Sequence, residues 1–243
     1  MTKDPCQSKK TADPSRGAIE RATAAMAHDV LTPLRNISAL SGAMKADLTA
    51  SPEKVGEFFD VMERSASTAA ARVEALIDYL SLDVPDPMVA VDLGEAASAA
   101  YDALDSERKK RLLLRIEGSG RCLGDLGLLE RAFSELLKNA ADFGALPQSE
   151  DDQSVAEVDI SFRSDSNAIV VAVSDNGPGI AAPHQALKLF QKRHADEDAP
   201  GLGIGLPLAQ KIFELHGGSL AFSDDSVERR GVCLTLTLPS LEG

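Results

Sequence analysis

Apolar residues recur every three to four positions in two long stretches near the N-terminus. The first stretch starts near residue 17 and places apolar side chains at Met26, Val30, Pro33, Ile37, Leu40 and Met44. The second follows the break TASPEK and places them at Val55, Phe58, Met62, Ala66, Ala69, Val73, Leu76 and Leu80. Alternating steps of three and four are typical of helices that pack along one seam. The pattern therefore predicts an antiparallel helical hairpin.

One hairpin cannot enclose its own apolar seam. A twofold homodimer would bury it as a four-helix bundle, because each hairpin would then cover the other. Pro52 suits the first turn of the second helix. We therefore expect a dimeric helical domain at this end of the chain.

A different pattern follows Pro85 and Pro87, which end the second helix. Helical periodicity predicts helices over 93–109, 126–143 and 207–218, and apolar runs or alternation predict strands over 111–118, 155–162, 168–175 and 231–239. Such a mixture favours an α/β sandwich with helices on one face of a mostly antiparallel sheet. The overall class is α+β, with a flexible arm at 1–16, the hairpin at 17–84, a linker at 85–90 and the sandwich at 91–243.

Net charge and cysteine content indicate which classes of partner and which cellular compartment to expect. The 243 residues carry a net charge of -13, which disfavours nucleic acid and anionic membranes and leaves proteins or metal-bound nucleotides. Three scattered cysteines, Cys6, Cys122 and Cys233, lack metal-ligand spacing and indicate a reducing compartment, so we expect a cytoplasmic protein. Since no apolar run is long enough to span a bilayer, we expect no membrane sensor within this chain.

His28 is the first candidate for chemistry. At about 100° per residue it lies about 200° from Met26, which turns it away from the seam toward solvent. Asp29 can orient the imidazole, and Thr32 lies one turn further along the same face. Most exposed histidines are only surface residues. Pro33 favours a functional role here, because proline is costly inside a helix and frees the carbonyl of Asp29.

Three polar or glycine-rich segments in the second half suggest an anion and metal site. Asp175 ends an apolar strand in DNGPGI, and GLGIGL opens an amphipathic helix whose free N–H groups could meet phosphate. Glu135 and Asn139 stand at i and i+4 on a helix, where their oxygens suit Mg²⁺. Taken singly, these segments are also compatible with a hairpin turn and a solvated helix face.

Together the segments resemble a known family. HDVLTP resembles the phosphoacceptor box of two-component sensor histidine kinases in His28, Asp29, Thr32 and Pro33. ELLKNAADF, DNGPGI and GLGIGL resemble, in order, the N box and two glycine boxes of the ATPase fold shared by histidine kinases, type II topoisomerases, MutL-type proteins and a heat-shock chaperone family. The segments HGGSLAFS and GVCLTLTLP match the sensor kinase branch.

The resemblance implies roles for individual residues. His28 would take the phosphoryl group from ATP, Asp29 would assist proton transfer, and Thr32 could position water for phosphatase action. Asn139 would ligate Mg²⁺ with support from Glu135. The residues implied in nucleotide binding are Asn139, Phe143 and Asp175 for the metal and adenine, Gly177 and Gly179 for the base pocket, Gly201, Gly203 and Gly205 for the phosphates, and Phe190, Lys192 and Arg193 in a lid over 181–200.

Three positions depart from the family pattern. Asp142 stands where a basic residue is common, Leu202 replaces a small polar residue, and Leu187 replaces a lid aromatic. A carboxylate near a triphosphate repels it unless a cation intervenes. These changes bear on nucleotide affinity more than on the fold.

The resemblance thus predicts an ATP-dependent protein-histidine kinase that phosphorylates His28 and passes the group to an aspartate of a response regulator. Its partners would be a second copy of the chain, that regulator, and a separate sensor protein or a sensor region missing from this chain. The alternative is a histidine phosphotransfer protein with a degenerate ATPase domain. A protein-serine kinase or anti-sigma switch would not need the hairpin, and an ATP-gated clamp would need a further transducer domain.

Overall fold

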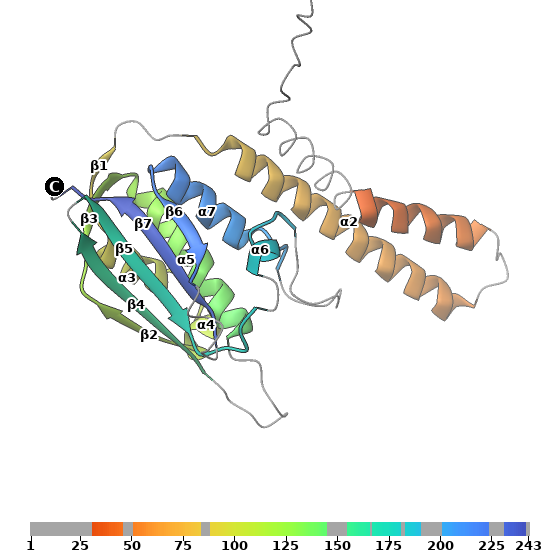
Figure 1. The fold of residues 1–243 in the computed structure, drawn as a ribbon. Helices are drawn as coiled ribbons and strands as arrows, with labels where there is room; N and C mark the ends of the chain where they lie inside the picture. The colour runs from red at the N-terminus through yellow and green to blue at the C-terminus, as the bar shows by residue number, and fades with distance from the viewer. Residues whose placement is uncertain are drawn as a thin grey trace, which may run out of the picture. The chain divides into compact units, whose positions relative to one another are not determined.

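The computed structural model describes residues 31–45, 51–83, 88–144, 155–165, 167–180, 183–190, 201–223 and 231–241. The chain divides into two compact units, residues Met1–Glu74 and Ala75–Gly243. Each unit has its own architecture (Figure 1). The division falls within a long helix, α2, which spans Pro52–Ser81.

The first unit contains a helix over residues 31–45 and most of α2. The described seam positions follow the predicted pattern in the first helix: Pro33 is buried, and Ile37, Leu40 and Met44 are half-buried. In α2 the pattern holds only in part, since Ala69 is buried while Val73 is 40% exposed. Met26 and Val30 lie outside the described residues. The single chain therefore leaves part of its apolar helix surface uncovered.

The second unit is built on a five-stranded sheet with strand order β2-β4-β5-β7-β6. The strands are β2 (Leu112–Glu117), β4 (Ala156–Asp165), β5 (Ala168–Asp175), β7 (Cys233–Pro239) and β6 (Ser219–Phe222). Only the β2–β4 pair is parallel; the other pairs are antiparallel. This confirms the prediction of a mostly antiparallel sheet. A separate two-stranded sheet pairs β1 (Val89–Asp92) with β3 (Arg121–Gly124).

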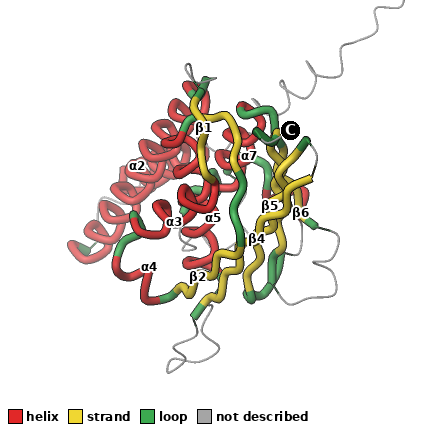
Figure 2. Tube along the Cα trace, turned by 90° about the vertical axis from the view of Figure 1, so that its left-hand side faces the viewer, coloured by secondary structure: helices red, strands yellow, loops and turns green. Residues whose placement is uncertain are grey.

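Helices lie against the sheet (Figure 2). They are α3 (Leu93–Asp102), α4 (Ser106–Lys110), α5 (Leu126–Phe143) and α7 (Gly205–Leu215). A short further helix, α6 (Pro183–Ala186), precedes the glycine-rich segment. Alternate residues of β5 and β7 are buried, namely Ile169, Val171, Val173, Leu234, Leu236 and Leu238. In the same core, Phe133 of α5 meets Phe213 of α7 edge to face with ring centroids 6.1 Å apart. The packing therefore fixes α5 and α7 beside each other.

The structure corrects two details of the prediction. The single helix expected over 93–109 is two helices, because Asp105 is extended and its side chain accepts the Arg108 N–H at 2.9 Å, which starts α4 anew. β1 begins at Val89, inside the predicted linker. Each strand of the small sheet has only four residues, too few for alternation to mark them.

His216 joins the two long helices of the second unit. It is 5% exposed, and its Nε2 accepts the Asp125 N–H at 3.0 Å while its Nδ1 lies 2.7 Å from the Ile212 carbonyl. With Nε2 as the acceptor, Nδ1 is the ring nitrogen that can donate to the Ile212 carbonyl. Asp125 in turn caps α5 by accepting the Leu128 N–H. His216 thus ties the end of α7 to the start of α5.

Candidate nucleotide-binding site

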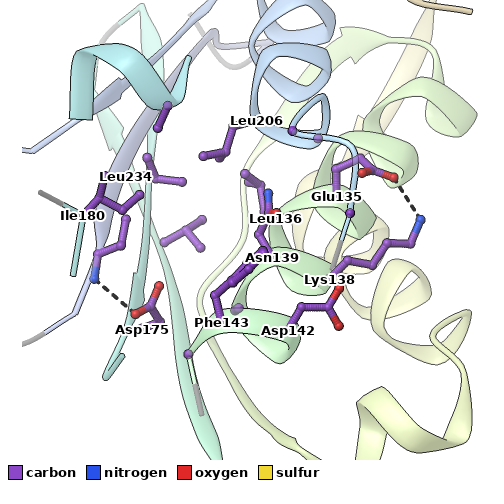
Figure 3. A pocket seen from close by; sticks show the side chains of 18 of the residues that line it. Glu135, Leu136, Lys138, Asn139, Asp142, Phe143, Asp175, Ile180, Leu206 and Leu234 are labelled. Atoms are coloured by element: carbon purple, nitrogen blue, oxygen red, sulfur yellow. Dashed lines mark hydrogen bonds and ion pairs between the residues drawn. The ribbon is translucent and has the colours of Figure 1, made fainter. Parts of the chain in front are cut away.

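A pocket of about 400 Å³ opens between α5, the end of β5 and the glycine-rich segment before α7 (Figure 3). Its volume falls in the range of small-ligand sites. Of the predicted site residues, those that line it are Glu135, Asn139, Phe143, Asp175, Gly201, Gly203 and Gly205. Three sequence segments that are far apart in the chain therefore meet at one cavity.

Other predicted site residues lie elsewhere. Gly177, Gly179 and Phe190 are described but do not line the cavity itself. Thr32 belongs to the first unit and is half-buried. His28, Asp29, Lys192 and Arg193 lie outside the described residues, so their roles remain predictions.

Asp175 is held in one orientation at the end of β5. Its Oδ1 accepts the N–H of Gly177 at 2.8 Å and the N–H of Val232 at 3.1 Å. Its own N–H donates to the Val232 carbonyl at 2.9 Å. A carboxylate oriented in this way at a cavity wall can accept a hydrogen bond from an amino group of a ligand.

Glycine is required beside Asp175 because the backbones approach closely. A Cβ at Gly177 would lie 2.8 Å from Asp175 Oδ1 and 2.8 Å from the Cα of Gly144, at the end of α5. Gly179 has φ +75°, which a residue with a side chain rarely adopts. These two glycines therefore let the β5 turn close against α5, even though they do not line the cavity.

The opposite side of the pocket combines a helix N-terminus with two polar side chains of α5. A Cβ at Gly205 would lie 2.8 Å from Glu135 Oε2 and 3.2 Å from Asn139 Nδ2, so glycine lets these two side chains approach the start of α7. Among the described residues, no side chain caps the first N–H groups of α7. Uncapped N–H groups at the positive end of a helix attract anions. Gly201 and Gly203, with φ +86° and +72°, shape the segment that leads to them.

Asn139 places a buried hydrogen-bond donor on this side of the pocket. Its Nδ2 is buried and, among the described residues, has no hydrogen-bond partner. A buried donor without an acceptor costs about 1 to 3 kcal/mol, which an oxygen of a bound ligand would recover. The residues on this side therefore fit a ligand that presents an anionic oxygen to Asn139.

Phe190 lies beside the glycine segment rather than in the cavity. It is 5% exposed, has φ +61°, and its N–H donates to the Gly203 carbonyl at 2.8 Å. A positive φ at phenylalanine is unfavourable and persists only where surrounding contacts impose it. Phe190 therefore anchors the segment before residue 191 to the glycine segment.

The structure places two cations at the pocket that the motifs did not indicate. Lys138 lies 2.9 Å from Glu135, one turn back along α5. Arg108 comes from α4, and its Nε and one terminal nitrogen each lie 2.9 Å from an oxygen of Asp142. Lys138 could have been found from its i, i+3 spacing to Glu135. Arg108 could not, because 34 residues separate it from Asp142.

The three departures from the family pattern have local explanations. Asp142 is paired with Arg108. Leu187 packs against the hydrophobic core, which an aliphatic side chain can do as well as an aromatic one. Leu202 lines the pocket and makes its wall more apolar there.

Family models match both parts of the chain. The phosphoacceptor domain described as His Kinase A matches residues 18–84, and the ATPase domain described as histidine kinase-, DNA gyrase B- and HSP90-like matches residues 124–242. The chain therefore carries the two domains that these models describe, a phosphoacceptor domain and an ATPase domain of the histidine kinase type. The ATPase match includes α5, β5 and α7, the elements that form the pocket.

Curated sensor kinases resemble this histidine kinase core over most of its length. It is 28% identical to the methanogenesis regulatory histidine kinase FilI of Methanothrix harundinacea over 230 residues, 91% of this chain and 25% of that protein. It is 28% identical to the sensor protein IrlS of Burkholderia pseudomallei over 226 residues, 86% of this chain and 45% of that protein. The chain thus spans a quarter to about half of the length of these relatives.

Solved structures support the fold of the kinase core. The Acinetobacter baumannii histidine kinase AdeS matches 88% of this chain and 98% of its own with a TM-score of 0.58 and 17% identity. The histidine kinase ThkA, in complex with the response regulator protein TrrA, matches 94% of this chain and 65% of its own with a TM-score of 0.60 and 17% identity. Within the part of this chain that the structure describes, no helix is both long and apolar enough to cross a membrane.

Proposed function

We propose that the chain is the catalytic core of an ATP-dependent protein-histidine kinase that phosphorylates its own His28 and passes the phosphoryl group to an aspartate of a response regulator. The observation that carries this proposal is the pocket in which Asp175, the Asn139–Glu135 pair and the uncapped N-terminus of α7 meet. Such a pocket offers an acceptor for an amino group at one end and anion-binding groups at the other. These are the two requirements of ATP.

The proposed reaction needs one nucleophile and a neutralised triphosphate. A ring nitrogen of His28 forms a bond to the γ-phosphorus while the bond from that phosphorus to the bridging oxygen breaks, and ADP leaves. Asp29 assists the loss of the ring proton. Positioning and charge neutralisation supply most of the rate in such transfers, and the N–H groups after Gly203 and Gly205 are suited to both.

Mg²⁺ fits the proposed site because of the chemistry of Asn139 and Glu135. Bound there, the ion would neutralise charge on the phosphate oxygens. Among the described residues no three His, Cys, Asp or Glu side chains group closely enough to hold a metal alone. The ion would therefore share its coordination with phosphate oxygens and water, as Mg²⁺ usually does in nucleotide sites.

Two further features support the proposed partners. Phe59 and Val73 of α2 are 55% and 40% exposed in the single chain, as are Leu31 and Leu34 at 43% and 45% in the preceding helix. A second copy that covers them would form the four-helix bundle. The ThkA structure contains a response regulator, which supports a receiver domain as the phosphoryl acceptor.

Thr32 would position water if the core also acts as a phosphatase.

The proposed role also suggests where the protein acts and where its signal comes from. We place the core in the cytoplasm, with its signal from a separate sensor protein or from a sensor region outside this chain. The domain boundaries at residues 17–84 and 91–243 belong to the same proposal. A phosphotransfer protein with a degenerate ATPase domain is the alternative, and the preserved Asn139, Asp175 and glycines argue against it.

The proposal is tested by the chemistry of the product. Incubated with Mg²⁺ and ATP labelled at the γ-phosphate, the purified chain should acquire label that acid removes and alkali does not, as expected of phosphohistidine. Addition of a cognate response regulator should move the label to that protein. Label that resists acid, or an ATP analogue that binds without any labelling by ATP, contradicts the proposal. Failure to bind an ATP analogue favours the phosphotransfer alternative, whose ATPase domain is degenerate.

Asp175→Asn is expected to weaken ATP binding and to change the preferred base. Gly177 and Val232 can still donate to Oδ1 of the asparagine, but its amide nitrogen is a donor and opposes the adenine amino group. We expect the Kd of an ATP analogue to rise about tenfold to a hundredfold. Binding of the inosine analogue, whose 6-oxo group accepts a hydrogen bond, should weaken less or improve. Calorimetric titration of both nucleotides measures this, and equal losses for the two bases would contradict the assignment of Asp175 to the base.

A further inference from the structure

Asp142 is the residue of the pocket that opposes a triphosphate most directly. It stands three residues after Asn139 on α5, and positions i and i+3 are neighbours on a helix surface. In Figure 3 it lies with Lys138 and Glu135, across the pocket from Asp175. Asp142 is therefore at the end of the pocket that the metal and phosphates would occupy, and an unpaired carboxylate there would repel them.

Arg108 neutralises the Asp142 carboxylate by forming a bidentate ion pair with it. Its Nε and one terminal nitrogen each lie 2.9 Å from a different oxygen of Asp142, which is the bidentate geometry of strong arginine–carboxylate pairs. The Asp142 side chain is only 18% exposed, so water screens the pair little. The two carboxylates that contact Arg108 raise its pKa still further above its usual range, so the guanidinium stays charged.

The guanidinium is also fixed in place from the other side. Its second terminal nitrogen lies 2.7 Å from Oδ2 of Asp105, whose Oδ1 accepts the Arg108 N–H and caps α4. The same residue that separates α4 from α3 therefore orients Arg108 toward Asp142. A short helix that the sequence did not predict thus delivers the cation to the pocket.

Each cation that lines the pocket is paired with a carboxylate that also lines it. The charged side chains that line the described pocket are the cations Arg108 and Lys138 and the carboxylates Glu135, Asp142 and Asp175. Lys138 pairs with Glu135 and Arg108 with Asp142, so only Asp175, at the opposite side, lies outside these two pairs.

We propose that Arg108 is a positioning residue for nucleotide affinity, which acts through Asp142 by neutralising it at the triphosphate end of the site. From α4 it offsets the negative charge that Asp142 places on α5. This inference rests on the proposed function, because it requires that a nucleotide triphosphate binds in the pocket.

Four chains test the inference: the wild type, Arg108→Gln, the double variant Arg108→Gln with Asp142→Asn, and the control Lys110→Gln. Lys110 lies on the same helix, pairs only with Glu107 among the described contacts, and is 70% exposed, so its loss changes the net charge equally without altering the pocket. Each chain is titrated with the Mg²⁺ complex of a non-hydrolysable ATP analogue and, separately, with adenosine, which has no phosphates. Thermal unfolding confirms that each is folded.

For Arg108→Gln we expect about tenfold weaker binding of the analogue and less than about twofold change for adenosine, because only the phosphates meet the uncovered carboxylate. The double variant should return to within about threefold of the wild type, because no unpaired charge remains. The control should match the wild type. If Arg108→Gln does not fold, the affinity of the double variant tests the inference, which requires that this variant bind the analogue nearly as well as the wild type.

Four outcomes overturn the inference. Equal weakening of analogue and adenosine would show that Arg108 only holds α4 against α5. A double variant as weak as Arg108→Gln would show that Asp142 is not the group through which Arg108 acts, and an unchanged Arg108→Gln would show that the pair has no influence. Failure of the wild type to bind the analogue would overturn the proposed function itself, and this inference with it.

Discussion

Replacing His28 by glutamine is expected to abolish self-phosphorylation while leaving nucleotide binding intact. The chain has four histidines. His216 cannot serve as acceptor, because it is 5% exposed and both of its ring nitrogens are engaged with backbone groups. His184 and His194 fall in the segment predicted to be the lid, and only His28 stands in the phosphoacceptor box. Loss of a nucleophile should lower the labelling rate at least about a thousandfold.

The control for this variant is His194→Gln, which removes a histidine of the predicted lid. It should retain labelling, and both variants should bind the ATP analogue within about twofold of the wild type, because distant sites act independently. The measurement is acid-labile label per chain against time, with calorimetric binding in parallel. Persistent acid-labile label on His28→Gln would sink the assignment of His28 as the acceptor.

Gly231→Ala is expected to destabilise the second unit and to disable the nucleotide site together. A Cβ at this position would lie 1.8 Å from the Asp175 carbonyl oxygen, and the backbone has φ +108°. The chain must move to relieve the overlap, which separates Asp175 from Val232, its partner in two hydrogen bonds. We expect a loss of about 3 to 5 kcal/mol in the free energy of unfolding and roughly 10 °C in Tm.

The matched control is Gly56→Ala in α2, where nothing lies within 4 Å of an added Cβ. Alanine favours helix there, so its Tm should equal or slightly exceed that of the wild type. Thermal unfolding followed by circular dichroism measures both variants, and titration with the ATP analogue should show at least about tenfold weaker binding for Gly231→Ala only. A Gly231→Ala chain with unchanged Tm and affinity would contradict the close contact at Asp175.

The longer elements of the second unit could be predicted from periodicity alone. The helix expected over 126–143 and the strand over 168–175 coincide with α5 and β5. Both carry a full apolar pattern of the right period. Asp125 marks the start of α5 as its N-cap, and Asn176 marks the end of β5 in a turn. Shorter elements escaped prediction: β1, β3 and β6 have four residues each, and their pairing depends on partners distant in sequence.

Some residues of the pocket could likewise be predicted from the sequence, and others could not. Glu135 and Asn139 could be recognised because their spacing places them on one helix face, and Asp175 because it ends an apolar strand. Arg108 could not be recognised, and Asp142 taken alone was expected to weaken the site. Local spacing contains no information about a contact across 34 residues. The packing of α4 therefore decided that the Asp142 carboxylate is paired with a cation.

What the sequence by itself determined is the family, the order of the long elements and most of the residues at the pocket, because each depends on spacing within a single helix, strand or turn. What only the tertiary structure decided is how these segments meet: the closeness of Gly205 to Glu135, the two bonds that orient Asp175, and the cation that covers Asp142. The physical reason is that electrostatic and steric interactions act through space, over a few ångströms, between groups that the chain separates by tens of residues.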